Sequence, residues 1–167
     1  LWIALGPSIK LAFYLVYFAA FALILITDIE RRLILNVVTY PAIFIAIVAG
    51  FVNPGIWITW QSALLGGAIA FVFFLLAAIA GNALFGSGAL GGGDVKLAAF
   101  IGLATGFPLV IEAVTLAILI GAAVSLVLLV ARVRRLRDHI PYGPFLVAGA
   151  VITLLWGYPI ADWFLGG

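Results

Sequence analysis

Residues 11–28 read LAFYLVYFAAFALILITD, an apolar stretch without a charged residue until the aspartate that closes it. A helix needs about 20 predominantly apolar residues to cross the hydrocarbon core of a bilayer, which is roughly 30 Å thick. With the residues that flank it, this stretch reaches that length. It therefore predicts a membrane-spanning helix that carries an acidic side chain at its end.

The rest of the chain has the same character. Hydrophobic residues make up 67% of the 167 residues, charged residues make up 8%, and the mean hydropathy is +1.38. This composition is typical of a multi-pass membrane protein, and α-helices satisfy their own backbone hydrogen bonds in lipid. We expect an all-α bundle of about six transmembrane helices, formed by residues 1–167 as one membrane-embedded domain.

The residue types that build metal sites are scarce. The chain has no cysteine and one histidine, which excludes disulfides and thiolate ligands and argues against a structural zinc site. We expect no metal and no cofactor. The lipid bilayer is the expected surrounding, and no nucleic acid partner is expected.

Turn residues and charges divide the chain into six expected spans. Glycine-rich sequence at 81–93 is interpreted as a loop, and Gly66 and Gly67 as a site where helices pack closely. The fourth span is short, so we expect part of it to lie inside the bundle. The expected spans are residues 11–27, 37–52, 56–80, 94–105, 111–130 and 144–163.

The basic residues predict the orientation. If the helices alternate in direction, three of the connecting regions share one side of the membrane, and seven of the eight Lys and Arg residues lie there. The positive-inside rule makes this side cytoplasmic and places the amino terminus outside. Asp28 and Asp94 then lie at the same face and could meet. The seven residues are Arg31, Arg32, Lys96, Arg132, Arg134, Arg135 and Arg137.

A carboxylate beside lipid costs several kcal/mol unless it is satisfied or used, so Asp28 and Asp94 are candidate functional residues. Two facing carboxyls share a proton, so that one can activate water while the other protonates a substrate, and such a pair can hydrolyse a peptide bond. Asp28 is expected at the end of a helix and Asp94 at the start of one. The helix dipole therefore predicts that Asp28 is protonated more easily than Asp94.

Three segments resemble those of a known family. GGGDVKL at 91–97 resembles the second catalytic motif of the GxGD aspartic peptidases of membranes, specifically the prepilin peptidases, and DIERRLILN at 28–36 resembles the first. Leu35 stands where the family usually has proline. IPYGPF at 140–145 is similar to the segment that opens the family's last helix.

The resemblance implies an aspartic endopeptidase with Asp28 and Asp94 as the catalytic residues. Its implied substrates are type IV prepilins or pseudopilins, whose basic leaders are cut at the cytoplasmic face of the inner membrane. Larger members carry an extra amino-terminal region, often with a cysteine-rich loop, that is associated with N-methylation. This chain has no cysteine, so the resemblance implies a peptidase without a separate methyltransferase domain.

Six further residues are candidates for supporting roles: Gly91, Gly92, Gly93, Lys96, Asn36 and Glu30. The glycines could allow a peptide to approach closely, or could only form a connector. Lys96 could stabilise the ionised Asp94 or anchor a helix end. Asn36 could cap the second span, which is favoured over a catalytic role. Glu30 could tune Asp28 or bind a basic leader, or it could be a solvated acid paired with a neighbouring arginine.

Other function classes remain open at this stage. A proton-coupled small transporter also uses carboxylates within a membrane, but it predicts acids inside the spans rather than at one edge. A structural or assembly subunit would tolerate neutralisation of either aspartate. Preflagellin peptidases and relatives of signal-peptide peptidase share the GxGD motif, so they remain alternatives within the peptidases.

Overall fold

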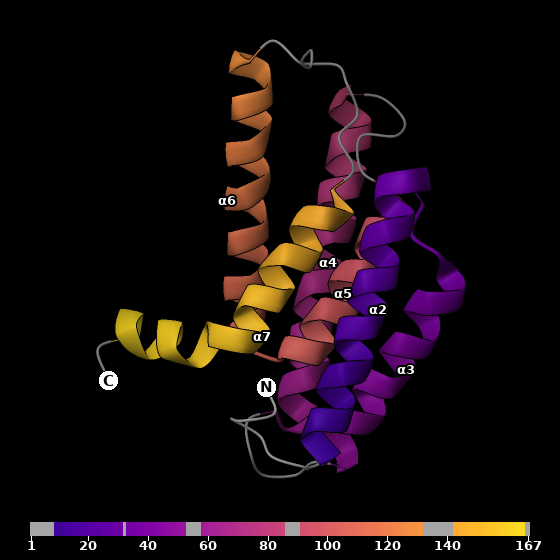
Figure 1. Ribbon diagram of the computed structural model, residues 1–167, viewed down its shortest axis with the longest axis vertical. Helices are drawn as coiled ribbons and strands as arrows, with labels where there is room; N and C mark the ends of the chain where they lie inside the picture. The colour runs from indigo at the N-terminus through magenta and orange to yellow at the C-terminus, as the bar shows by residue number, and fades with distance from the viewer. Residues whose placement is uncertain (1–8, 32, 53–57, 86–90, 132–141, 166–167) are drawn as a thin grey trace.

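The computed structural model describes residues 9–31, 33–52, 58–85, 91–131 and 142–165. These residues form six α-helices and no strand, which confirms the all-α prediction (Figure 1). The helices are α2 (Ile9–Arg31), α3 (Asn36–Val52), α4 (Trp60–Phe85), α5 (Gly92–Thr105), α6 (Leu109–Val130) and α7 (Gly143–Leu165).

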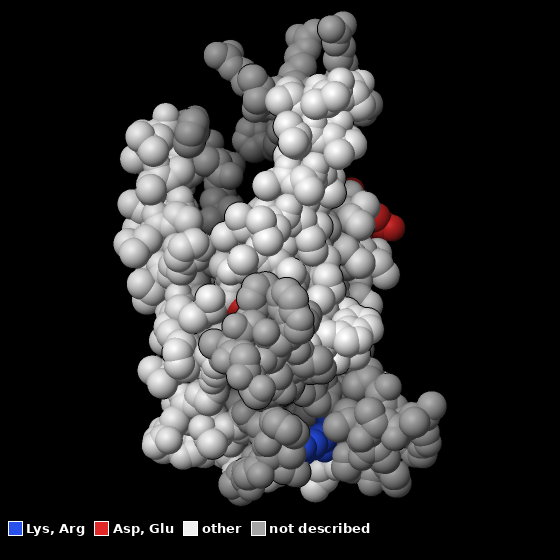
Figure 2. All heavy atoms as spheres, turned by 90° about the vertical axis from the view of Figure 1, so that its left-hand side faces the viewer, with Lys and Arg blue, Asp and Glu red and all other residues white. Residues whose placement is uncertain are grey.

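Three of the described helices, α2, α4 and α6, are long and apolar enough to cross a membrane. Figure 2 shows that uncharged side chains cover most of the described surface on the side of α6. Large apolar residues such as Leu119, Leu126 and Val127 are exposed there, as expected of a surface that faces lipid. The chain is therefore a membrane protein, while the number of crossings stays a prediction.

The short helix α5 occupies the middle of the bundle. Its side chains Leu97, Phe100 and Ile101 are essentially inaccessible, and α4, α3 and α7 pack around it. At about 1.5 Å per residue, 14 residues extend about 21 Å, less than the thickness of the hydrocarbon core. The prediction that this segment lies inside the bundle is confirmed (Figure 1).

Glycines bring α4 and α5 into backbone contact. A Cβ atom added at Gly102 would meet the carbonyl oxygen of Gly66 and would lie 2.6 Å from its carbonyl carbon. A Cβ atom at Gly67 would lie 2.7 Å from Cγ of Leu103. Small residues permit such an approach between membrane helices, so the predicted close packing at Gly66 and Gly67 is confirmed.

Hydrogen bonds hold the turn between α5 and α6 against the start of α4. Phe107 donates its N–H to the Ser62 carbonyl at 3.0 Å, and the Ser62 hydroxyl donates to the Phe107 carbonyl at 2.7 Å. Gly106 has φ +69°, a conformation that favours glycine. This turn ends α5 at Thr105 and reverses the chain into α6.

Several predicted boundaries need correction. Helix α2 continues to Arg31, so Asp28 lies in its last turn rather than beyond its end. The expected loop at 81–93 is too long, because α4 continues to Phe85 and α5 already includes Gly92 and Gly93. Ala83 and Leu84 are good helix formers and extend α4 past Gly81. The remaining loop glycines Gly86 and Gly88, and the four arginines of 132–137, lie outside the described residues.

Candidate active site

Asp28 is placed by the inward face of α2. The buried side chains of this helix recur every three or four residues through Tyr17, Phe21 and Ile24 to Asp28, the spacing of a helix face that packs on a core. Asp28 is 5% exposed, and its Oδ2 atom has no hydrogen-bond partner among the described residues. A buried carboxyl oxygen is normally satisfied, and the group that lies against this oxygen is Gly143 of α7.

Asp94 is held by the first turn of α5. Its Oδ2 atom accepts a hydrogen bond from the N–H of Gly91 at 3.2 Å, and its own N–H donates to the Gly91 carbonyl at 3.1 Å. The side chain is half-buried. The amino-terminal end of a helix favours negative charge, so both the cap and the helix stabilise an ionised Asp94.

The two carboxyls interact electrostatically. Burial raises the pKa of Asp94 to about 6, the Gly91 N–H opposes this rise, and the carboxyl of Asp28 adds to it. The pairing of the two acids stays a prediction, and so does their catalytic role.

The start of α7 completes this end of the bundle, and the sequence analysis did not single it out as part of a site. Gly143 faces Asp28, because a Cβ atom at Gly143 would lie 3.0 Å from Cγ of Asp28 and would contact its Oδ2 atom. Tyr142 lies near the second acid: burial raises the pKa of the Tyr142 phenol, and the nearby Asp94 carboxyl raises it further. The segment at 140–145, quoted for its family resemblance, was the signal that could have identified both.

Lys96 and Asn36 connect two helices rather than contacting the acids. The Lys96 ammonium donates to Oδ1 of Asn36 at 3.0 Å, and it lies 5.1 Å from the centre of the Tyr40 ring. Of the two interpretations of Lys96, these contacts favour an anchor between α5 and α3. Asn36 is the first residue of α3, and the hydrogen bond recorded for its side chain goes to Lys96 instead of to a backbone N–H.

The remaining supporting candidates differ in their surroundings. Gly93 packs against Ile34, because an added Cβ atom would lie 2.9 Å from Cβ of Ile34. Gly92 has nothing within 4 Å of that position, and Gly91 has an ordinary extended conformation. Glu30 is exposed in the last turn of α2, and no ion pair is recorded for it among the described residues. A side chain at Gly93 would therefore clash with Ile34, whereas a Cβ atom at Gly91 would lie 3.3 Å from Oδ2 of Asp94.

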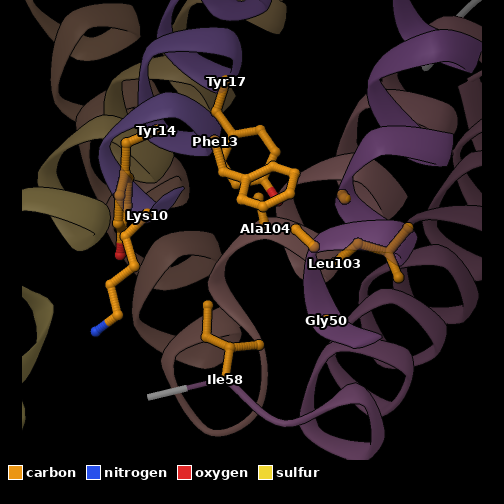
Figure 3. Close-up of a pocket in the computed structure, with 10 residues that line it drawn as sticks. Lys10, Phe13, Tyr14, Tyr17, Gly50, Ile58, Leu103 and Ala104 are labelled. Atoms are coloured by element: carbon orange, nitrogen blue, oxygen red, sulfur yellow. The ribbon is translucent and has the colours of Figure 1, made fainter. Parts of the chain in front are cut away.

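A pocket at the other end of the bundle is a separate feature. Figure 3 shows it between the start of α2 and the ends of α3 and α5, with Lys10, Tyr14 and Leu103 among its lining residues. No acidic residue lines it. Within the described part of the chain, no group of three or more His, Cys, Asp or Glu side chains could hold a metal ion.

The sequence from residue 15 to residue 126 matches the model of the type IV leader peptidase family. The chain belongs to this family. The matched region contains both Asp28 and Asp94, together with all of α3, α4 and α5. The acid pair described above therefore lies in the part of the chain that defines family membership.

Several curated relatives are named prepilin leader peptidase/N-methyltransferase. The chain is 29% identical to the one from Bacillus subtilis over 164 residues, which cover 98% of this chain and 63% of the relative. It is 27% identical to the one from Xanthomonas campestris over 138 residues, covering 83% and 47%. The relative from Pseudomonas aeruginosa is 28% identical, also with 83% and 47% covered. The chain thus spans about half to two thirds of these relatives, and no solved structure matches it significantly.

Proposed function

We propose that this chain is a membrane aspartic endopeptidase that removes the basic leaders of type IV prepilins or pseudopilins. The observation that supports the proposal is that the carboxyl of Asp28, on α2, contributes to the raised pKa of Asp94 at the start of α5. Family membership and the names of the relatives support the same substrate class. We place only the peptide cleavage in this bundle, because both acids belong to it.

The proposed reaction uses the acids in complementary protonation states. The ionised Asp94 takes a proton from a water molecule, and the resulting hydroxide attacks the carbonyl carbon of the scissile bond. The protonated Asp28 supplies a proton to the leaving nitrogen, so that the carbon–nitrogen bond breaks into a carboxyl and an amine. Two acids whose environments separate their pKa values can divide the roles of base and acid in this way.

We further propose that the acids face the cytoplasm and that the amino terminus lies outside the inner membrane. The distribution of basic residues supports this orientation. In that arrangement, a basic leader would remain on the cytoplasmic side while the apolar segment after the cleavage site lies in the membrane. The scissile bond would then reach the end of the bundle that carries Asp28 and Asp94.

The test is cleavage of a panel of purified type IV and tight-adherence prepilins by the protein in lipid nanodiscs, followed by mass spectrometry of both fragments. We expect one cut at the leader boundary, and loss of the cut in Asp94→Asn. Glu112→Gln is the control, because Glu112 is an acid in the first turn of α6, which follows the opposite end of α5 from Asp94. A folded wild-type protein that cuts no member of the panel would contradict the proposal and would favour another GxGD substrate or the transporter.

A further inference from the structure

The pocket at the end of the bundle opposite the two acids has no task in the proposed hydrolysis. Helices α2, α3 and α5 all contribute to its walls, and its volume is about 50 Å³. One buried water needs about 10–15 Å³ of cavity volume and several polar partners. Hydrocarbon fits this pocket better than water, because most of its lining is apolar: Phe13, Ala46, Ala49, Gly50, Leu103 and Ala104.

A positive charge lies at the edge of the pocket. Lys10 is in the first turn of α2, and Tyr14 follows one helical turn later on the same face. Figure 3 shows the two side chains next to each other, across the pocket from Leu103. Both are half-buried, and among the described residues no hydrogen bond or ion pair is recorded for the Lys10 ammonium or the Tyr14 hydroxyl. Two donors are therefore available to one ligand at this edge.

Aromatic side chains indicate that the pocket lies near a membrane surface. Gly50, which lines it, packs against Trp60, because a Cβ atom at Gly50 would lie 3.3 Å from Cα of Trp60. The Trp60 ring stacks on Phe51 with ring centres 5.8 Å apart, and both residues are exposed. Tryptophan and tyrosine are enriched at the level of the lipid headgroups. A ligand here can reach both headgroups and hydrocarbon.

We propose that this pocket binds one anionic phospholipid. The Lys10 ammonium and the Tyr14 hydroxyl hold the lipid phosphate, and part of one acyl chain enters the apolar pocket. The charges are complementary, because Lys10 is the charged residue of the lining and no acid accompanies it. A free phosphate would leave the apolar walls unoccupied, so the lipid is the better match. The inference does not depend on the proposed peptidase function.

The bound lipid would join three helices at this end of the bundle. Its phosphate would contact α2, while its acyl chain would lie against Ala49 of α3 and Leu103 of α5. A ligand that binds only the folded protein stabilises it. The lipid should therefore stabilise the packing of these helices without contacting Asp28 or Asp94.

The test is native mass spectrometry of the protein in detergent, titrated with dioleoylphosphatidylglycerol or with dioleoylphosphatidylcholine, which has the same acyl chains. We expect the tightest site to prefer phosphatidylglycerol about tenfold, the effect of one charge-assisted contact. Lys10→Gln should remove this preference, and Lys10→Arg should keep it, because a guanidinium also binds phosphate. Arg31→Gln is the matched control and should keep the preference, since it removes an exposed basic residue at the other end of α2.

A second variant tests the apolar part of the site. Ala49→Leu places a larger side chain in the pocket and should weaken the binding of both lipids at least about tenfold. Ala19→Leu makes the same change at an exposed position of α2 and should alter neither.

Equal affinity of the wild type for the two lipids would overturn the inference, as would wild-type binding by Lys10→Gln or by Ala49→Leu. Glycerol phosphate that competes as well as the lipid would also overturn it, because the site would then bind a free phosphate. If Ala49→Leu does not fold, the variants of Lys10 and the competition decide.

Discussion

The carboxyl of Asp28 packs directly against Gly143, the first residue of α7. At Gly143 a methyl group would contact Oδ2 of Asp28 and lie 3.0 Å from its Cγ. We therefore predict that Gly143→Ala displaces Asp28 and lowers the rate of prepilin cleavage about a hundredfold, the effect expected of a misplacement of about 1 Å. The rate is measured in nanodiscs on protein whose folding is checked by thermal unfolding. A folded variant with wild-type activity would contradict this account of Gly143.

The electrostatic contact between the acids predicts a change in titration. Because the carboxyl of Asp28 contributes to the raised pKa of Asp94, the Asp28→Asn variant should lower this pKa below about 6. Burial remains the larger cause, so the pKa should stay above the usual value for aspartate. Residue-resolved carboxyl NMR measures the shift, with Glu112→Gln, which removes an acid in the first turn of α6, as the control. An unchanged or higher pKa of Asp94 would mean that the acids do not interact.

The same titration tests the order of protonation. The dipoles of α2 and α5 predict that Asp28 takes up its proton before Asp94 as the pH falls. Since coupled acids titrate as a pair, only resonances resolved for each residue can decide this point. Earlier protonation of Asp94 would reverse the roles of acid and base in the proposed reaction.

Among the elements, the pairing of α4 with α5 determines where Asp94 lies. The backbone contact between Gly66 and Gly102 leaves no space for a methyl group. We predict that Gly102→Ala lowers the free energy of unfolding by about 3 kcal/mol, at the upper end of the range for overpacked cores. Equilibrium unfolding in detergent measures the loss. Gly92→Ala is the control for stability, because its Cβ atom would meet nothing within 4 Å, and an equal loss there would contradict the explanation.

At the scale of the whole molecule, the orientation can be tested with single cysteines in a chain that has none. Ala131→Cys places a thiol just after α6, and Thr59→Cys places one just before α4; both positions are exposed. The positive-inside rule predicts that a membrane-impermeant maleimide labels Ala131→Cys from the cytoplasmic side only and Thr59→Cys from the outside only. Reversed labelling would place the acids outside, where a basic cytoplasmic leader could not reach them.

Much of the architecture could be predicted from the sequence. In lipid the backbone must form its hydrogen bonds within the protein, and this requirement favours helices for long apolar segments. Long apolar runs predict helices, and the short run before Gly106 predicted the helix inside the bundle. The ends of helices were predicted less well. Asp28 and Gly81 are poor helix formers, yet α2 and α4 extend past them because neighbouring residues and packing favour the helix. Asp28 and Asp94 stand out as candidates because they are charged residues in an apolar chain, and their pairing stays a prediction.

Contacts between distant segments could not be predicted in this way. Nothing in the local sequence says that Gly143 faces Asp28, that Tyr142 lies near Asp94, or that Lys96 bonds to Asn36 sixty residues away. These contacts depend on the packing of α7 and α3 against the rest of the bundle. A single sequence shows the residue types but not which distant residues contact one another in the fold.

The measurement that tests the central claim most directly is the initial rate of prepilin cleavage by Asp28→Asn, Asp94→Asn and the double variant, each shown to be folded. If the acids work as one catalytic unit, each single variant should lose at least about a thousandfold in rate, and the double variant should be no slower than either. A single variant that keeps substantial activity, or losses that multiply in the double variant, would contradict the account of Asp28 and Asp94 as a catalytic pair.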